Sequence, residues 1–358
     1  MPVIVSVETA VPPHPLPQEL AKAFAREHFS MSLRDATRLL PVFDHAGVSQ
    51  RYLGAPLDWL QSPHGFAEKN ERYQTVAAAI ASEAATKALA QTPFAPTDID
   101  AVLYVTSTGI ATPSLDVKLI TALGLRNDVS RLPIWGLGCA GGAAGLARAA
   151  DWTRAHPDHV VLLVCVELCS LTFIGSDHST RNLVGAALFG DGAAAAIVVG
   201  TDRAASAGLT IGADILGARS FLFSDSQDIM GWDVTDEGLA VVFSRDIPTL
   251  VEKEMAEQVD AMLALHGLDR RDLAHFIAHP GGAKVIAAYA RALDCPIDWL
   301  RHAASVLSDY GNMSSPTVLF VLSRAIAERR EHLAAPRQYG ILAALGPGFS
   351  CEQVLLSM

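Results

Sequence analysis

The sequence has few charged residues, few cysteines and no long hydrophobic run. Only 18% of its 358 residues are charged and 50% are hydrophobic, so the chain can bury a large core and extended disorder is excluded. The formal net charge of -11 argues against a general nucleic-acid binder, because phosphate contacts require clustered Lys and Arg. An anionic small substrate would need only a local basic patch.

Signals for secretion and membrane insertion are also missing. The N-terminus lacks the positively charged region of a signal peptide. The most apolar stretch, 160–166, is followed by Glu167 and is too short to cross a bilayer, so no membrane span is expected. The five cysteines are scattered without a CxxC pair, which is typical of the reducing cytoplasm, where we expect the protein to reside.

Alanine-rich helical stretches alternate with β-type runs, which indicates a layered α/β architecture. The order of these elements in the first half is repeated in the second. Val105, at the end of a predicted strand, precedes Gly138 by 33 positions, and His279 precedes Gly311 by 32. Such internal similarity predicts two similar halves related by a pseudo-twofold axis.

We place these halves at about 1–205 and 206–358. The first half carries Cys139, and the second carries His279 and Asn312. Because equivalent strand ends in two related halves meet at the centre of the molecule, we expect these three side chains to converge on one site.

Cys139 lies between Gly138 and Ala140-Gly141-Gly142, where a strand is expected to turn sharply into a helix. Backbone N–H groups and the dipole at a helix start favour an anion. A thiolate in that setting has a lowered pKa and is a good nucleophile. The alternative is a small buried core cysteine.

His279 and Asn312 offer hydrogen bonds to such a centre. His279 is held by the following Pro280-Gly281-Gly282, and an imidazole can pair with a thiolate and donate to a developing oxyanion. Asn312 offers an amide donor without a proton-transfer group. The alternatives are a structural histidine, one of twelve, and a helix N-cap asparagine.

Five segments, in this order and spacing, resemble the type III polyketide synthases, the chalcone synthase superfamily. They are Gly-Cys-Ala-Gly-Gly at 138–142, Leu-Phe-Gly-Asp-Gly-Ala-Ala at 188–194, His-Pro-Gly-Gly at 279–282, Gly-Asn-Met-Ser-Ser-Pro at 311–316 and Gly-Pro-Gly-Phe at 346–349. The resemblance implies a thiolase-like layered αβαβα fold built from two similar halves. It also implies a transferase that uses coenzyme A thioesters and holds no metal or tightly bound cofactor.

The resemblance also implies a role for each site residue. Cys139 would accept an acyl-CoA starter and carry the growing chain. His279 and Asn312 would activate Cys139, promote decarboxylation of malonyl-CoA and hold the resulting enolate. The expected reaction is an iterative decarboxylative Claisen condensation followed by cyclisation.

The resemblance assigns residues to the substrate cavity as well. Phe189 would be an aromatic gatekeeper, and three further residues fall at or near cavity-shaping positions: Thr172, Gly231 and Ser314. Val241 stands where plant enzymes often have Phe, which leaves more room and favours a medium- to long-chain fatty acyl starter. The segment 66–73 also resembles bacterial members that make alkylpyrones or alkylresorcinols.

Contacts to coenzyme A and to a second subunit follow from the resemblance alone. Coenzyme A phosphates would be bound near Arg38, His45 and Arg51, although such a residue is more often a solvated surface charge. Thr112 would reach the cavity of a partner subunit, which implies a homodimer.

Other readings of the sequence remain open at this point. A non-iterative ketoacyl synthase-like enzyme of the thiolase fold, a catalytically inactive thiolase-fold binding protein and a cysteine hydrolase share parts of the pattern. Degradative thiolases add a second catalytic cysteine near the C-terminus, but the context of Cys351 is that of a core strand. Pyrone and resorcinol closure, and an acyl carrier protein in place of coenzyme A, are not distinguished.

Overall fold

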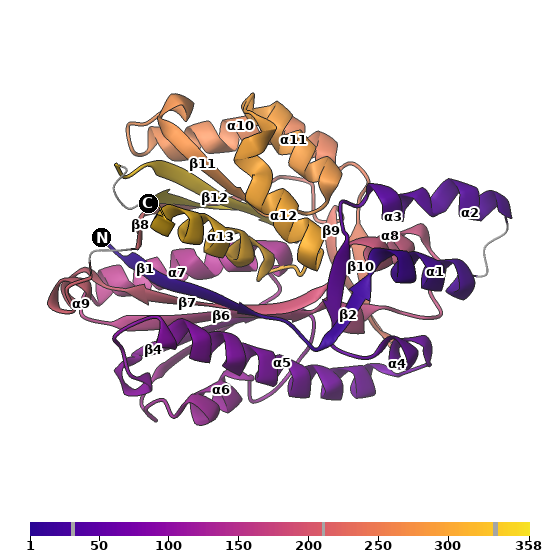
Figure 1. Cartoon of the computed structure of the whole chain (residues 1–358), viewed down its shortest axis with the longest axis horizontal. Coiled ribbons are helices and arrows are strands. Elements are labelled where there is room, and N and C mark those ends of the chain that lie inside the picture. The colour runs from indigo at the N-terminus through magenta and orange to yellow at the C-terminus, as the bar shows by residue number, and fades with distance from the viewer. Residues whose placement is uncertain (30–32, 210–211, 332–335) are drawn as a thin grey trace.

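The computed structural model describes residues 1–29, 33–209, 212–331 and 336–358 (Figure 1). Its helices are α1 (Gln18–His28), α2 (Leu33–Leu39), α3 (Pro41–His45), α4 (Leu57–Gln61), α5 (Phe66–Ala90), α6 (Asp116–Leu123), α7 (Gly141–Ala155), α8 (Thr180–Leu188), α9 (Thr201–Ser206), α10 (Ile247–Ala264), α11 (Ala283–Leu293), α12 (Arg301–Tyr310) and α13 (Thr317–Glu331). Its strands are β1 (Val3–Ala10), β2 (His14–Pro17), β3 (Gln50–Leu53), β4 (Ala101–Thr106), β5 (Ser130–Trp135), β6 (Val160–Leu168), β7 (Asp191–Val199), β8 (Ala213–Leu222), β9 (Met230–Thr235), β10 (Gly238–Phe243), β11 (Leu273–Ala278), β12 (Tyr339–Gly346) and β13 (Ser350–Ser357).

Nine of the described strands form one mixed sheet in the order β11-β12-β13-β8-β1-β7-β6-β4-β5. Strands β1 and β8 pair antiparallel where the two halves of the sheet join. Outward from this junction the strands run β1-β7-β6-β4 on one side and β8-β13-β12-β11 on the other, and each outer pair is parallel. The strand order thus repeats as the sequence spacing predicts. The boundary proposed at residue 205 falls inside α9, which links β7 to β8.

Helices cover and separate the two halves of this sheet. Figure 1 shows α10 and α11 on the outside of one half, α5 and α6 on the outside of the other, and α7 and α13 between the halves. The five layers are therefore αβαβα, which confirms the predicted fold class. Strands β6 and β7 are buried along their whole length because helices lie on both faces, and their sequences are runs of Val, Leu, Ile and Ala.

The middle layer depends on the small residues of α7. A side chain at Gly142 would collide with the backbone of Ser315, and one at Gly145 would approach Leu163 to 2.6 Å. Glycine therefore lets α7 pack directly against the start of α13 and against the sheet. Because Cys139 immediately precedes α7 and Asn312 precedes α13, this packing brings both residues to the centre of the molecule.

A smaller group of elements packs at one end of the layers. Helices α1, α3 and α8 share an apolar cluster there, and the hairpin β9–β10 contacts α8. Figure 1 places this group at the right, next to the ends of β6 and β7. None of the helices in the described ranges is long and apolar enough to cross a membrane.

Candidate active site

The structure brings Cys139 and Asn312 together: Cys139 Sγ lies 3.9 Å from Asn312 Oδ1. His279 follows β11 and is anchored to the neighbouring strand, since its N–H donates to Ala343 O at 2.9 Å. The turn that carries Cys139 packs on that same strand, β12. All three side chains are buried, with exposed fractions of 7%, 3% and 0% for Cys139, His279 and Asn312.

Glycine makes the turns before Cys139 and Asn312. Gly138 has φ +46°, and a side chain there would meet Pro347 at 2.8 Å. Gly311 has φ +70°, and a side chain there would lie 2.8 Å from Leu188 O. Both backbones are in the left-handed region that glycine adopts without strain. Glycine therefore precedes Cys139 and Asn312 because the backbone there has positive φ and leaves no space for a side chain.

Burial keeps the two titratable side chains, Cys139 and His279, uncharged. Burial raises the pKa of Cys139 to about 11, although hydrogen bonds with Ser314 and Asn312 act in the opposite direction. Burial also lowers the pKa of His279 to about 3. The lowered thiol pKa expected from the helix start is therefore wrong for this structure, because the loss of water outweighs the hydrogen bonds.

Polar atoms at this site have unused hydrogen-bonding capacity. Both ring nitrogens of His279 and the Nδ2 of Asn312 are buried and have no hydrogen-bond partner within the described part of the chain. An unpartnered buried donor costs about 1–3 kcal/mol, so such groups are rare unless a ligand uses them. By contrast, Asn312 Oδ1 accepts from Ser314 N at 2.8 Å, which fixes the amide so that Nδ2 is the free end.

A cavity of about 20 Å³ adjoins Cys139 and collects four of the predicted cavity residues, Phe189, Gly231, Val241 and Ser314. A second cavity of about 60 Å³ contains Thr172. Phe189 and Val241 line both cavities, so these two side chains form the partition between them. Most of the remaining lining of the second cavity is apolar: Leu16, Ala21, Phe24, Leu53, Leu57, Leu60 and Phe173.

Two aromatic residues of the site were missed from the sequence. Trp232 and Phe243 line the cavity at Cys139, and their ring centroids lie 6.2 and 6.4 Å from that of Phe189. Phe243 follows Val241 by two positions on β10, so both side chains point to the same face. That alternation, applied to 238–243, would have identified Phe243 once Val241 was placed.

A third and larger cavity, of about 670 Å³, opens beside the site. Arg38 and His45, which the resemblance assigns to the coenzyme A phosphates, line it. Three further cations on its wall were missed, because they come from distant segments without a local motif: Arg181, Arg245 and Lys284. Phe243 lines this cavity and also the one at Cys139, so it lies at the boundary between them.

Two predicted residues lie elsewhere. Arg51 is only 1% exposed and does not line the large cavity, and its guanidinium donates to backbone carbonyls near α8. A phosphate contact would require the loss of those bonds, so the structure separates Arg51 from Arg38 and His45. Thr112 is exposed near the edge strand β5 and lines none of the three cavities. Cys351 is buried in β13, as expected of a core cysteine.

Comparisons with known proteins agree along almost the whole chain. Residues 2–203 match the N-terminal domain of the chalcone and stilbene synthases, and residues 215–358 match the C-terminal domain of that family. A protein of Bacillus subtilis strain 168, provisionally named a chalcone synthase, is 42% identical over 99% of this chain and 98% of its own length.

Two proteins named 1,3,6,8-tetrahydroxynaphthalene synthase are also similar. The 1,3,6,8-tetrahydroxynaphthalene synthase of Streptomyces peucetius is 38% identical over 99% of this chain and 92% of its own length. The crystal structure of the Streptomyces coelicolor synthase of that name, a bacterial type III polyketide synthase, superposes with a TM-score of 0.92 at 29% identity and covers 99% of both chains. The chain therefore belongs to the chalcone and stilbene synthases, the type III polyketide synthases of thiolase fold, and is an acyltransferase of that family.

Proposed function

We propose that this enzyme transfers a medium- to long-chain fatty acyl group from coenzyme A to Cys139 and extends it with malonyl-CoA. Repeated extension and ring closure would give a product of the alkylpyrone or alkylresorcinol type. The observation that carries this proposal is the contact of Cys139 with Asn312, in a site where His279 and Asn312 keep unpartnered hydrogen-bonding groups.

Acyl transfer requires removal of the Cys139 proton. Burial keeps His279 uncharged, so a ring nitrogen is free to accept that proton. The same burial disfavours a separated thiolate and imidazolium, so the proton is transferred as the sulfur attacks the thioester. The sulfur attacks the thioester carbonyl of the starter, the carbon–sulfur bond to coenzyme A breaks, and the leaving thiolate takes a proton. The acyl group then occupies the cavities on either side of Phe189 and Val241.

Extension requires a carbanion equivalent of malonyl-CoA. When the carboxylate leaves as carbon dioxide, the electron pair moves onto the thioester as an enolate. Nδ2 of Asn312 and an N–H of His279 are the donors available to this oxygen. Removal of one such donor in other enzymes slows the reaction by about 10²–10³. The enolate carbon attacks the Cys139 thioester and lengthens the chain by two carbons.

The cavities support an aliphatic starter. Val241 replaces a larger ring at the partition, and the second cavity beyond it is lined mainly by apolar side chains of α1, β3 and α4. Contact with these walls would remove apolar surface of an alkyl chain from water, which stabilises the bound chain by about 25 cal/mol per Å². Among the described residues, the one charged residue in its lining is Arg51, which is bound to the end of α8, so the walls offer a polar starter no free charge.

The coenzyme A thioester would enter through the large cavity. The chain carries a net charge of -11, yet five basic side chains line this one opening: Arg38, His45, Arg181, Arg245 and Lys284. Such a local concentration of positive charge favours the phosphates of coenzyme A. Five free thiols and CoA thioester substrates are consistent with the cytoplasmic location that we propose.

A homodimer is part of the same proposal. The edge strand β5 exposes Leu132 and Trp135 at 39% and 51%, and Ile110 beside it is 47% exposed. A second copy of the chain covering this apolar edge would bury these side chains. It would also bring the exposed Thr112 towards the partner's cavity.

The test is mass spectrometry of the products formed from malonyl-CoA and acyl-CoA starters ranging from acetyl to stearoyl. We expect pyrone or resorcinol masses from long-chain starters, none from Cys139→Ala, and a shorter accepted chain for Val241→Phe. Cys139→Gln, which mimics an acylated site, should keep malonyl decarboxylation. A tetrahydroxynaphthalene product from malonyl-CoA alone would replace the long-chain proposal. Full condensation by Cys139→Ala would overturn the mechanism.

A further inference from the structure

Arg51, on β3, is buried against the C-terminal end of α8. Its Nη1 donates to Ala186 O at 2.7 Å and to Phe189 O at 3.1 Å. Its Nη2 donates to Ala187 O at 2.8 Å and also to the side-chain oxygen of Gln18. One guanidinium therefore binds three backbone carbonyls within four consecutive residues.

These carbonyls are the ones that a helix end leaves without partners. Helix α8 ends at Leu188, so Ala186 and Ala187 lie in its last turn and their oxygens have no intrahelical donor. A cation at a helix C-terminus is also favoured by the helix dipole. The planar guanidinium of arginine donates hydrogen bonds to several acceptors at fixed angles, whereas the ammonium group of lysine is a single compact donor. Gln18 Nε2 adds a second donor to Ala187 O at 3.1 Å.

The segment that Arg51 holds is paired directly with Asn312. Asn312 N donates to Leu188 O at 2.8 Å, and Gly190 N donates to Asn312 O at 3.0 Å, so Phe189 and Asn312 form a parallel bridge. Any movement of Leu188 or Gly190 therefore moves the backbone of Asn312. This bridge links the backbone of the gatekeeper Phe189 directly to that of Asn312.

The side chain of Arg51 also fills the space beside that bridge. A Cβ atom at Gly190 would lie 3.2 Å from Arg51 Cβ, and one at Gly311 would lie 3.6 Å from it. The two glycines let the backbones of the bridge approach each other, and the stem of Arg51 packs against both of them. The contact is made by both the aliphatic stem and the charged head of the same residue.

We propose that Arg51 is a positioning residue for the active site: by binding the carbonyls at the end of α8, it fixes Phe189 and, through the bridge, the amide of Asn312. This inference rests on the proposed role of Asn312 as an enolate donor. It replaces the contact with coenzyme A that the sequence suggested for Arg51. Arg51 touches no reacting atom, so its largest effect should fall on the steps that need Asn312 in place, and a smaller one on acyl binding beside Phe189.

The experiment separates two partial reactions in Arg51→Met, which keeps the length of the stem and removes every donor. Intact-protein mass spectrometry follows acylation of Cys139, and release of labelled carbon dioxide follows decarboxylation of malonyl-CoA. We expect decarboxylation to fall about 10²-fold, as for loss of one oxyanion donor. Acylation should stay within about threefold, because it needs Cys139 and His279 but no enolate.

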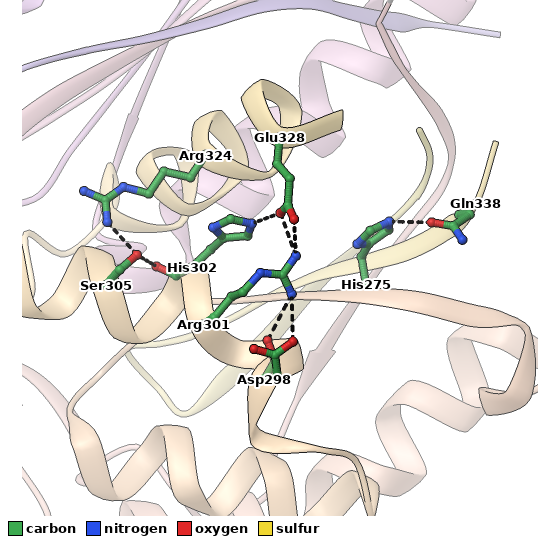
Figure 2. Close-up of polar contacts among 8 residues, drawn as sticks. All are labelled: His275, Asp298, Arg301, His302, Ser305, Arg324, Glu328 and Gln338. Carbon is green, nitrogen blue, oxygen red and sulfur yellow. Dashed lines mark hydrogen bonds and ion pairs between the residues drawn. The ribbon is translucent and has the colours of Figure 1, made fainter. Parts of the chain in front are cut away.

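Arg301→Met is the matched control. Arg301 lies on α12, which leads to Asn312, and it contacts Asp298 and Glu328 at the surface (Figure 2). The same change of side chain at this exposed position should leave both partial reactions within twofold of the parent enzyme. Arg51→Lys retains the charge with one compact donor group, and it should lose about tenfold in decarboxylation. If circular dichroism shows that Arg51→Met does not fold, Arg51→Lys tests the positioning role instead. A larger loss of decarboxylation than of acylation in that variant supports the role, and equal losses overturn it.

Asn312→Ala provides the benchmark. The double variant Arg51→Met/Asn312→Ala should release carbon dioxide no more slowly than Asn312→Ala alone, because both changes remove the same donor. Parallel loss of both partial reactions in Arg51→Met, or additive loss in the double variant, would overturn the positioning role. If Asn312→Ala alone decarboxylates malonyl-CoA normally, the proposed function of Asn312 is wrong. This outcome depends on no Arg51 variant, so it is distinguishable from a failure of the positioning role.

Discussion

Arg51 and Arg301 bind their partners in opposite surroundings. Arg51 is 1% exposed, and all but one of its acceptors are backbone carbonyls held by α8 and the residue after it. Arg301 has a side chain 39% exposed, and Figure 2 shows it between two carboxylates, Asp298 and Glu328, with His302 on the second. The first network fixes a stretch of main chain, whereas the second joins flexible side chains of neighbouring helices.

This difference determines what each network can do. Water and salt screen the exposed carboxylate–guanidinium contacts, and such pairs contribute about 0–1 kcal/mol. A buried polar network loses more when one member is removed, because the remaining groups stay unpartnered in a medium of low dielectric. We therefore expect the buried networks near the site to control geometry and stability together, and the network of Figure 2 to affect stability weakly.

Glu167 provides the largest test of this contrast. It is fully buried and accepts four hydrogen bonds at 2.8 to 2.9 Å, from Ser107 N, Ser107 Oγ, Thr108 Oγ1 and Ser315 Oγ. Glu167→Ala leaves these donors without an acceptor where β4, β6 and the start of α13 meet. We expect the free energy of unfolding, measured by urea denaturation, to fall by about 3–5 kcal/mol.

Glu167→Gln is the control, because it keeps one acceptor oxygen and nearly the same volume. Its loss should be smaller than that of the alanine variant. A loss below about 1 kcal/mol in Glu167→Ala would show that the buried carboxylate is no more important than an exposed one, and the contrast would fail.

Asp191 tests the same contrast through pH. Burial raises the pKa of Asp191 to about 7, while hydrogen bonds from Ser170 and Gly54 and the nearby charge of Arg51 act in the opposite direction. An unfolded Asp titrates near about 4, so between these values the folded protein binds more protons than the unfolded chain. This residue therefore stabilises the fold fully below pH ~4, and its contribution falls by up to about 1.4 kcal/mol per unit as pH rises towards 7.

Asp191→Asn removes this titration. In denaturation series between pH 4 and pH 8, the stability difference between the parent protein and Asp191→Asn should narrow as pH rises and become constant above pH ~7. A difference that widens with pH would mean that the carboxylate is ionised throughout and that its hydrogen bonds outweigh burial. The experiment thus measures which of the two causes is larger.

The sequence predicts the centre of the molecule better than its margins. Cys139 and Asn312 could be placed because a glycine, a polar residue and a small-residue helix recur at matching distances in both halves. The observed turns at Gly138 and Gly311 have positive φ angles that favour glycine, and a side chain at either position would collide with its neighbours. The layered fold followed from the same repetition. Local spacing carries this information because each element repeats in a fixed order along the chain.

The remaining site residues depend on contacts between distant segments. Arg51 looks like a surface cation in sequence, and only the fold shows that its partners lie 135 to 138 positions away at the end of α8. Arg181, Arg245 and Lys284 meet at one opening from α8, the segment after β10 and α11. No sequence pattern indicates that these three residues lie together. The basic residues of the large cavity could therefore be predicted only where the resemblance assigned them, at Arg38 and His45.

Glu328 should give the smallest effect and the opposite pH dependence. Its carboxylate is 38% exposed and binds Arg301 at 2.6 Å and His302 at 2.6 Å, and the hydrogen bond with Arg301 lowers its pKa (Figure 2). A carboxyl with a lowered pKa stabilises the fold above its unfolded pKa and loses that contribution as pH falls. Glu328→Gln should therefore cost less than about 1 kcal/mol near pH 7.

Two conditions should remove even this small loss. Once the pH has fallen below the lowered pKa of Glu328, the carboxyl of the parent protein is protonated, and at 1 M salt the Debye length is about 3 Å. In both cases the two proteins should unfold at nearly the same urea concentration. A loss that persists in 1 M salt would mean that the hydrogen bonds of Glu328, rather than its charge, hold α12 to α13. The exposed network would then resemble the buried one at Arg51, and exposure alone would no longer separate positioning contacts from weak ones.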